Sequence, residues 1–354
     1  MGEGYTLTKL PVGLLASCTS LHTLNIRHTK VVDLRPLSVC SRKLRSLDVS
    51  HTDLVDLGPL AVFSALRSLN CSFTRVKNLE PLEGLALQEL YCKSTQISDV
   101  GPVSSGTSLQ KLDIDDTSWL GDLSSLTSCR ALKSVKCGGA RVRDLSLGVF
   151  GPTLEVLKCC ESFLSDVSPM ASCKALKQIS IYDTRVSDVA PLASCLALEL
   201  VNCNRSCVTD MTPLAPCKLI RSLFFSDNEV LDLTFLALFK LLKKLDFSKT
   251  SVTDLLPLAT CSALEEVDCS EVPAVDMSPL GSCKMLKRLI CSNTGVSDLT
   301  CLASCPLLKE LDCSRTDVSD LTSLASCRRL RVLDCSWTVV TDLTFLASSC
   351  RLKM

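Results

Sequence analysis

The amino-acid sequence predicts an α/β solenoid, with a parallel β-sheet on one side and short 3₁₀ or helical turns on the other. Fifteen units follow one another at a spacing of 21 to 23 residues, from Leu21 to the unit that begins at Leu330. Numbered from its first leucine, the unit reads L-x-x-L-D-C-S-x-T-x-V-x-D-L-x-P-L-A-x-C. One such unit cannot bury its apolar side chains alone, but stacked units share a continuous core.

Each half of the unit has its own hydrophobic period. Positions 4 and 6, such as Leu311 and Cys313, are apolar around a variable residue, which indicates a short strand with one buried face. Positions 11, 14 and 17, such as Val318, Leu321 and Leu324, recur every three residues, which is typical of a tight 3₁₀ or helical turn. Asp at position 13 and Pro at position 16 are residues that begin such turns.

The repeat resembles a known family. L-x-x-L-x-C-x-x-T is similar to the leucine-rich repeat segment L-x-x-L-x-L-x-x-N, and "DLxPLA" resembles the 22-residue subclass of internalins and the leucine-rich regulator of protein phosphatase 1. The phrase "SxTxVSDLxPLASC" is similar to leucine-rich repeat proteins of kinetoplastid protozoa. The resemblance covers about residues 10 to 353 and implies a horseshoe or arc with the sheet on its concave face. It implies little about function, because this repeat serves unrelated partners.

The chain departs from those relatives at its ends and at one internal segment. Neither the flanking caps of internalins nor the C-terminal cap of the phosphatase regulator is visible, so we expect residues 1–20 to form a short N-terminal cap and 21–354 to form the solenoid. Poorly capped ends leave self-association open. The repeat is irregular at 117–153, where either a bend or loop carrying Trp119 or Phe150, or a degraded repeat, is expected.

Composition and charge exclude several classes of protein. The formal net charge is +0, from 38 basic and 38 acidic residues, which does not indicate nucleic-acid binding. No apolar run of about 18 residues predicts a membrane span, and the N-terminus does not resemble a signal peptide. "MGEGYT" fits the bare myristoylation pattern, although Glu3 and Tyr5 disfavour it. We therefore expect a cytoplasmic protein, whose thiols are kept reduced.

The 23 cysteines mostly follow the repeat. Twenty fall in two columns, position 6 and position 20 or one residue beyond, where Ile, Val, Leu and Phe also occur, so we interpret them as core side chains. Disulfides are the alternative, but an odd number cannot pair completely, and zinc requires tight clusters that are absent here. Cys160 stands at position 7, which we expect to face solvent, and it is therefore either a reactive thiol or an incidental surface cysteine.

The columns of Asp at position 13 and Thr at position 9 have a structural interpretation. Asp can cap backbone N–H groups of the following turn, whereas a calcium site requires six to eight converging oxygens. Thr can bond to nearby backbone groups, which Ala140 and Val272 at this position cannot do. The three histidines accompany no nucleophile motif or phosphate loop. The sequence thus predicts no enzyme, no metal and no cofactor, and it places His28 close to His51.

Positions 3, 5, 7 and 8 should point away from the sheet, and position 8 follows no visible rule. Because aromatic and charged side chains are favoured as interface anchors, we expect a protein partner of unknown identity to bind the concave face. Drift of exposed positions is the alternative explanation. The candidate anchors are Phe73 with Tyr91, Tyr182 with Phe224, the acidic run Asp113, Asp115 and Asp116, and Arg205, Arg315 and Trp337. A phosphatase-regulator-like subunit or a surface adhesin are the other hypotheses.

Overall fold

The computed structural model describes residues 7–11, 15, 18, 20–105, 108–143, 145 and 151–344. The chain forms two compact units, Met1–Leu176 and Lys177–Met354.

Every repeat contributes one three-residue strand at its positions 3 to 5. The fifteen strands follow chain order in one parallel sheet, and within each unit a strand residue pairs with the residue at the same position of the next repeat, as Leu47 does with Leu69. This confirms the predicted solenoid. In the first unit the strands are β1 Thr23–Asn25, β2 Ser46–Asp48, β3 Ser68–Asn70, β4 Glu89–Tyr91, β5 Lys111–Asp113, β6 Ser134–Lys136 and β7 Val156–Lys158. In the second unit they are β8 Gln178–Ser180, β9 Leu200–Asn202, β10 Ser222–Phe224, β11 Lys244–Asp246, β12 Glu266–Asp268, β13 Arg288–Ile290, β14 Glu310–Asp312 and β15 Val332–Asp334.

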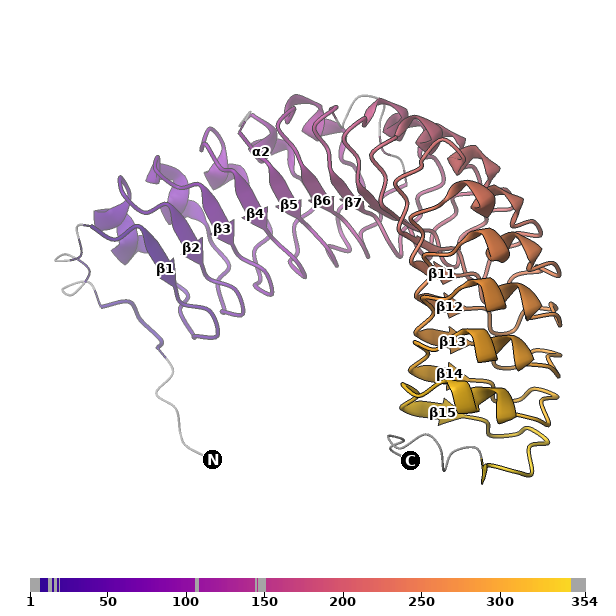
Figure 1. Ribbon diagram of the computed structural model, residues 1–354. Coiled ribbons are helices and arrows are strands. Elements are labelled where there is room, and N and C mark those ends of the chain that lie inside the picture. Colours follow the sequence, from indigo (N-terminus) through magenta and orange to yellow (C-terminus); the bar gives the residue numbers. More distant parts are fainter. Residues whose placement is uncertain are drawn as a thin grey trace. The chain divides into compact units, whose positions relative to one another are not determined.

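A short helix forms the opposite side of most repeats, as Figure 1 shows for each unit. Nearly all of these helices are 3₁₀, and many carry proline in their first turn, where its missing N–H is tolerated. The first unit contains η1 Arg35–Cys40, η2 Gly58–Val62, η3 Glu80–Leu82, α2 Gly101–Ser104, η4 Ser124–Ser128 and η5 Ser168–Ser172. The second contains η6 Ala190–Ser194, η7 Thr212–Leu214, η8 Thr234–Leu238, η9 Leu256–Thr260, η10 Ser278–Ser282, η11 Thr300–Ser304 and η12 Thr322–Ser326.

The core lies between the strands and these helices. In each regular repeat, positions 1, 4, 6, 11, 14, 17 and 20 are buried. In the repeat that begins at Leu308 they are Leu308, Leu311, Cys313, Val318, Leu321, Leu324 and Cys327, each with at most 1% of its surface exposed. Phe63 and Phe239 occupy position 20 in other repeats and are equally buried. The period read from the sequence therefore identifies the core correctly.

The two cysteine columns belong to this core, as expected from packing. Their thiols donate to backbone carbonyls: Cys269 Sγ lies 3.3 Å from the Ile290 oxygen, and Cys327 Sγ lies 3.4 Å from the Leu302 oxygen. Cys71 and Cys92 Sγ are 3.4 Å apart, well beyond a disulfide bond length. Burial raises the pKa of the Cys203 thiol to about 12, which favours the uncharged form.

The aspartates of position 13 cap the short helices, as predicted. In each described case the side-chain oxygen accepts a hydrogen bond from the N–H two residues later, for example 2.7 Å from Thr322 to Asp320 and 2.7 Å from Gly101 to Asp99. Asn78 accepts the same bond from Glu80. The threonines of position 9 donate to the carbonyl at position 6, as Thr316 does to Cys313 at 2.6 Å. The threonines therefore satisfy carbonyls that burial would otherwise leave unpaired, whereas the aspartates bond to N–H groups at the exposed starts of the short helices.

Two parts of the chain are less regular. In the fifth repeat Trp119 projects into solvent while Leu120 takes the buried place beside it. Phe150 and the segment around it lie outside the described residues. Within residues 7–20, as far as they are described, Leu10 and Leu15 are buried, and the Leu7 carbonyl accepts a hydrogen bond from Lys30. The N-terminal cap remains a prediction.

Candidate interaction surfaces

Position 8 has a backbone rule that the sequence interpretation missed. All fifteen residues there have positive φ: fourteen non-glycine residues lie between 51° and 58°, and Gly139 lies at 68°. The N–H of position 8 donates to the carbonyl at position 7 of the next repeat, as His51 does to Ser72 at 3.0 Å. A left-handed residue is most strained when its side chain is β-branched. The column contains no Val, Ile, Thr or Pro, and this absence was the available signal.

The position-8 side chains of the first three repeats form a stack of rings. The centroids of His28 and His51 are 4.3 Å apart, and those of His51 and Phe73 are also 4.3 Å apart. The expected proximity of the two histidines is confirmed. Phe73 terminates the stack and retains 43% of its surface exposed, so its ring is held in one orientation while it remains accessible.

The second unit uses the same column for paired charges and one large ring. Arg205 Nη2 lies 3.7 Å from Asp183, and Lys249 Nζ lies 3.4 Å from Glu271. The Arg315 guanidinium lies 5.9 Å from the centre of the Trp337 ring, which is a cation–π distance. Asn293, Arg315, Thr316, Asp317 and Trp337 line a hollow of about 390 Å³. With 81% of its surface exposed, Trp337 is available to a partner.

Positions 5 and 7 are mostly engaged with each other, contrary to the expectation that position 7 faces solvent. The Ser50 N–H and hydroxyl both donate to Asp48, at 2.9 and 2.6 Å, and Ser314 does the same to Asp312. Ser50 is buried. The "DCS" motif is therefore a local cap. Cys160, also at position 7, is buried with 8% of its surface exposed, so its expected place on the surface is wrong.

The acidic run is largely neutralised within the chain. Asp113 is buried, with its carboxylate 3.0 Å from Lys136 Nζ. Asp116 is exposed and lies 3.3 Å from Lys93 Nζ. Asp115 accepts a 2.7 Å hydrogen bond from the Gly138 N–H, and burial raises its pKa. The three carboxylates thus have partners before any basic protein arrives.

The remaining aromatic candidates are half-buried. Tyr91 ends β4, and its hydroxyl donates to Glu89 at 3.2 Å. Tyr182 stands at position 7 of its repeat and is half-buried. Phe224 ends β10 and lines a hollow of about 120 Å³ with charged residues of β11 and β12. The sequence interpretation missed Phe163, which is 43% exposed with the Arg143 guanidinium 5.6 Å from its ring centre.

Neither a metal-binding cluster nor a helix suited to cross a bilayer occurs among the described residues. In these segments His, Cys, Asp and Glu side chains form no group of three that could hold a metal ion. None of the helices described here combines the length and hydropathy that a bilayer crossing requires.

Comparisons with solved structures agree with this architecture. An internalin, InlF from Listeria monocytogenes, is 23% identical, covers 97% of this chain and 88% of its own, and gives a TM-score of 0.65. A leucine-rich repeat protein from Leptospira interrogans is 15% identical, covers 96% and 86%, and gives 0.75. The chain has the leucine-rich repeat fold.

A third solved structure with this fold contains a bound partner. The Arabidopsis receptor kinase HAESA, in complex with the peptide hormone IDA and the co-receptor SERK1, is 18% identical with a TM-score of 0.76. It covers 93% of this chain and 60% of its own. No protein-family model matches the sequence, and no curated protein matches it.

Proposed function

We propose that this leucine-rich repeat chain is a protein-interaction scaffold. Its partner would bind the sheet face, which carries positions 3 and 5, together with the position-8 column beside it. Phe73 in the first unit and Trp337 in the second are the anchors that we favour. We favour binding over catalysis, because exposed aromatic side chains are held in place by their neighbours.

The observation that carries this proposal is the fixed presentation of exposed rings. Phe73 is held by its stack on His51, and Trp337 lies against Arg315. The left-handed backbone of position 8 further limits where these side chains can point. Aromatic rings are frequent hot spots of protein interfaces, and side chains that are ordered before binding lose less entropy on association.

The fold is compatible with this role and with others. HAESA, which shares the fold, was solved with a peptide hormone and a protein co-receptor, which supports a polypeptide partner for this chain. A regulatory subunit of an enzyme is the narrower alternative, and a surface adhesin is the more distant one. Core thiols that donate to carbonyls support a reducing, cytoplasmic setting over an extracellular one.

A pull-down from native cell extract tests the proposal. Phe73→Ala and Trp337→Ala, made separately, should each reduce the recovery of a specific partner at least tenfold, because truncating a hot-spot ring costs about 2 kcal/mol or more. Val62→Ala and Leu256→Ala are matched controls, since both residues are exposed and apolar but belong to the short helices. Mass spectrometry of the retained proteins gives the readout.

The pattern of loss decides between the hypotheses. Loss with the ring variants but not with the controls supports binding at position 8. Equal recovery from all four variants contradicts it. If the captured partner is an enzyme whose rate changes on addition of the chain, the regulatory alternative is correct.

A further inference from the structure

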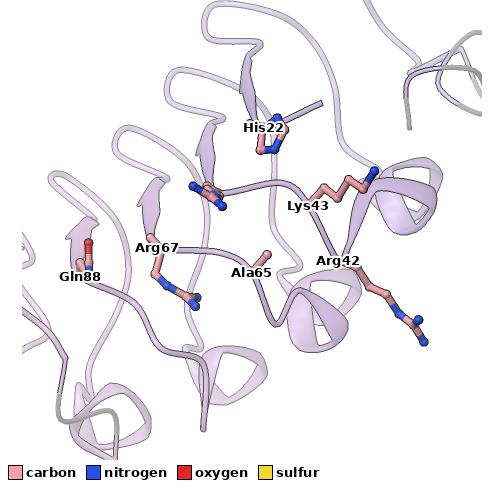
Figure 2. Close-up of a pocket in the computed structure, with 7 residues that line it drawn as sticks. His22, Arg42, Lys43, Ala65, Arg67 and Gln88 are labelled. Carbon is pink, nitrogen blue, oxygen red and sulfur yellow. The ribbon is translucent and has the colours of Figure 1, made fainter. Parts of the chain in front are cut away.

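A basic pocket lies at the edge of the first unit where its strands begin. Its volume is about 760 Å³, and its lining includes His22, Arg42, Lys43, Arg45, Arg67 and Gln88. Figure 2 shows His22, Arg67 and Gln88 near the starts of three strands of the sheet, with Arg42 and Lys43 on the segment that leads from a helix into the next strand. The lining contains four permanent cations and no carboxylate.

Backbone hydrogen bonds set the spacing of the pocket. His22, Arg45, Arg67 and Gln88 all stand at position 2, just before β1, β2, β3 and β4. The Arg45 N–H donates to the His22 carbonyl at 2.7 Å, and the Arg67 N–H donates to the Arg45 carbonyl at 2.8 Å. Adjacent strands of a sheet are ~4.8 Å apart. Arg45 and Arg67 therefore stand side by side at the starts of adjacent strands, and both line the pocket.

These cations have no acidic neighbours to neutralise them. Within the described part of the chain, Arg42, Lys43, Arg45 and Arg67 form no ion pair. The Arg67 side chain is instead oriented by two hydrogen bonds, from Nη1 to the Ser64 and Leu66 carbonyls at 3.0 and 2.9 Å. A cluster of unneutralised arginines around a hollow costs electrostatic free energy that a bound anion would recover.

In part of the second unit, the cations at position 2 are neutralised by a carboxylate. Glu265 stands at position 2 there, and its carboxylate pairs with Lys243 at 2.9 Å and with Lys287. The first unit has Arg45 and Arg67 in consecutive repeats where a glutamate could have alternated. Lys287, Lys309 and Arg331 also follow one another at position 2 of the second unit, and Lys287 there has Glu265 as its partner. What distinguishes Arg45 and Arg67 is the hollow that they line together with Arg42 and Lys43.

We propose that this pocket binds an acidic, phosphorylated segment of a protein partner. The inference rests on the proposed function, because it takes the partner to be a protein and specifies its chemistry. A guanidinium presents N–H groups in a planar fork that bonds carboxylate or phosphate oxygens in pairs. Arginine clusters are a recurring means of recognising phosphorylated and acidic motifs.

The size and charge of the pocket favour a peptide over other anions. Pockets of ~300–1,000 Å³ suit ligands larger than a single ion, so phosphate alone would leave much of this volume to water. Nucleic acid and anionic membranes are attracted by broad positive surfaces, whereas this chain has a net charge of +0. Gln88 and His22 add hydrogen-bonding groups at the rim.

Fluorescence anisotropy with a synthetic peptide tests the inference. The probe is a fluorescein-labelled decapeptide of Asp, Glu and Ser with one phosphoserine. The double variant Arg45→Ala, Arg67→Ala should bind it at least tenfold more weakly than the wild type, since hydrogen bonds to charged groups contribute about 1.5–3 kcal/mol each. Lys309→Ala, Arg331→Ala is the matched control, because both residues stand at position 2 of the second unit, and it should change the affinity less than twofold.

Four outcomes would overturn the inference. They are no binding to the wild type, equal loss in pocket and control variants, inorganic phosphate binding as tightly as the peptide, and tighter binding to phosphatidylserine vesicles than to the peptide. All variants must first show the wild-type circular dichroism spectrum and melting temperature. If the extract pull-down depends on Phe73 or Trp337 while the decapeptide does not bind, the proposed function stands and only this inference fails.

Discussion

The two units of the chain share one set of backbone bonds but use the exposed columns differently. At position 2 the first unit gathers Arg45 and Arg67 around a pocket without a carboxylate. The second unit places Glu265 between two lysines. Hydrogen bonds from Lys287 and Lys243 lower the pKa of Glu265 to about 2, which keeps the pair ionised under ordinary conditions.

Position 8 shows a second difference on the same backbone. The first unit stacks His28, His51 and Phe73, whereas the second pairs Arg205 with Asp183. Strand register, aspartate caps and buried positions do not change between the units. The fold is therefore encoded at positions that point inward or bond to the backbone, and we propose that recognition uses the exposed positions 2 and 8.

The largest expected effect is on stability at high pH. In the second unit Cys203, Cys283 and Cys313 have a pKa raised to about 12, and Cys217 and Cys305 to about 11, mainly by burial. The unfolded chain loses these protons near pH 9, whereas the folded chain retains them. Stability is therefore complete below pH 9 and is lost as the pH rises towards 11 to 12, by about 1 kcal/mol for each thiol at pH 10.

Urea denaturation at pH 7.5 and pH 10, followed by circular dichroism, measures this loss. Alkylation with iodoacetamide and peptide mapping would show where unfolding begins, and we expect the second unit to expose its thiols first. A urea midpoint that does not move, or earlier alkylation of Cys71 and Cys92, would contradict the difference between the units.

A smaller effect is expected at position 9, where the units should behave alike. Thr74 and Thr316 each donate to a position-6 carbonyl at 2.6 Å. Thr74→Val and Thr316→Val should each lower the free energy of unfolding by about 1 kcal/mol, because a buried carbonyl loses its partner. The reverse change, Val272→Thr, should raise it by a similar amount. Chemical denaturation gives all three values, and costs that differ widely between Thr74 and Thr316 would show that the backbone pattern is not equivalent in the two units.

The sequence predicts the strands, short helices and core well, because the same apolar spacing and the same capping residue recur from repeat to repeat. The spacing of Leu308, Leu311 and Leu324 is enough to identify strand, helix and core, and Asp320 indicates the cap. The left-handed backbone of position 8 was harder to predict. Its only signal in the sequence is that β-branched residues do not occur at this position. The burial of Cys160 and Ser50 was missed because the chain turns directly after the strand, so the alternation of the strand no longer applies.

The basic pocket was invisible for a different reason. Arg42 and Lys43 stand at the end of one repeat and Arg67 in the next but one, so only the stacking of repeats brings them to one hollow. A net charge of +0 for the whole chain also conceals a local excess of cations. Such a site becomes apparent only when residues at the same position of adjacent repeats are compared.

Arg45→Glu tests most directly the claim that fold and recognition are encoded at separate positions. This substitution places a carboxylate between His22 and Arg67, in the place that Glu265 has between Lys243 and Lys287. We predict a melting temperature within a few degrees of the wild type, since exposed ion pairs contribute about 0–1 kcal/mol, and at least a tenfold loss of affinity for the phosphoserine decapeptide. Unchanged affinity, or a loss of folding together with binding, would contradict the account.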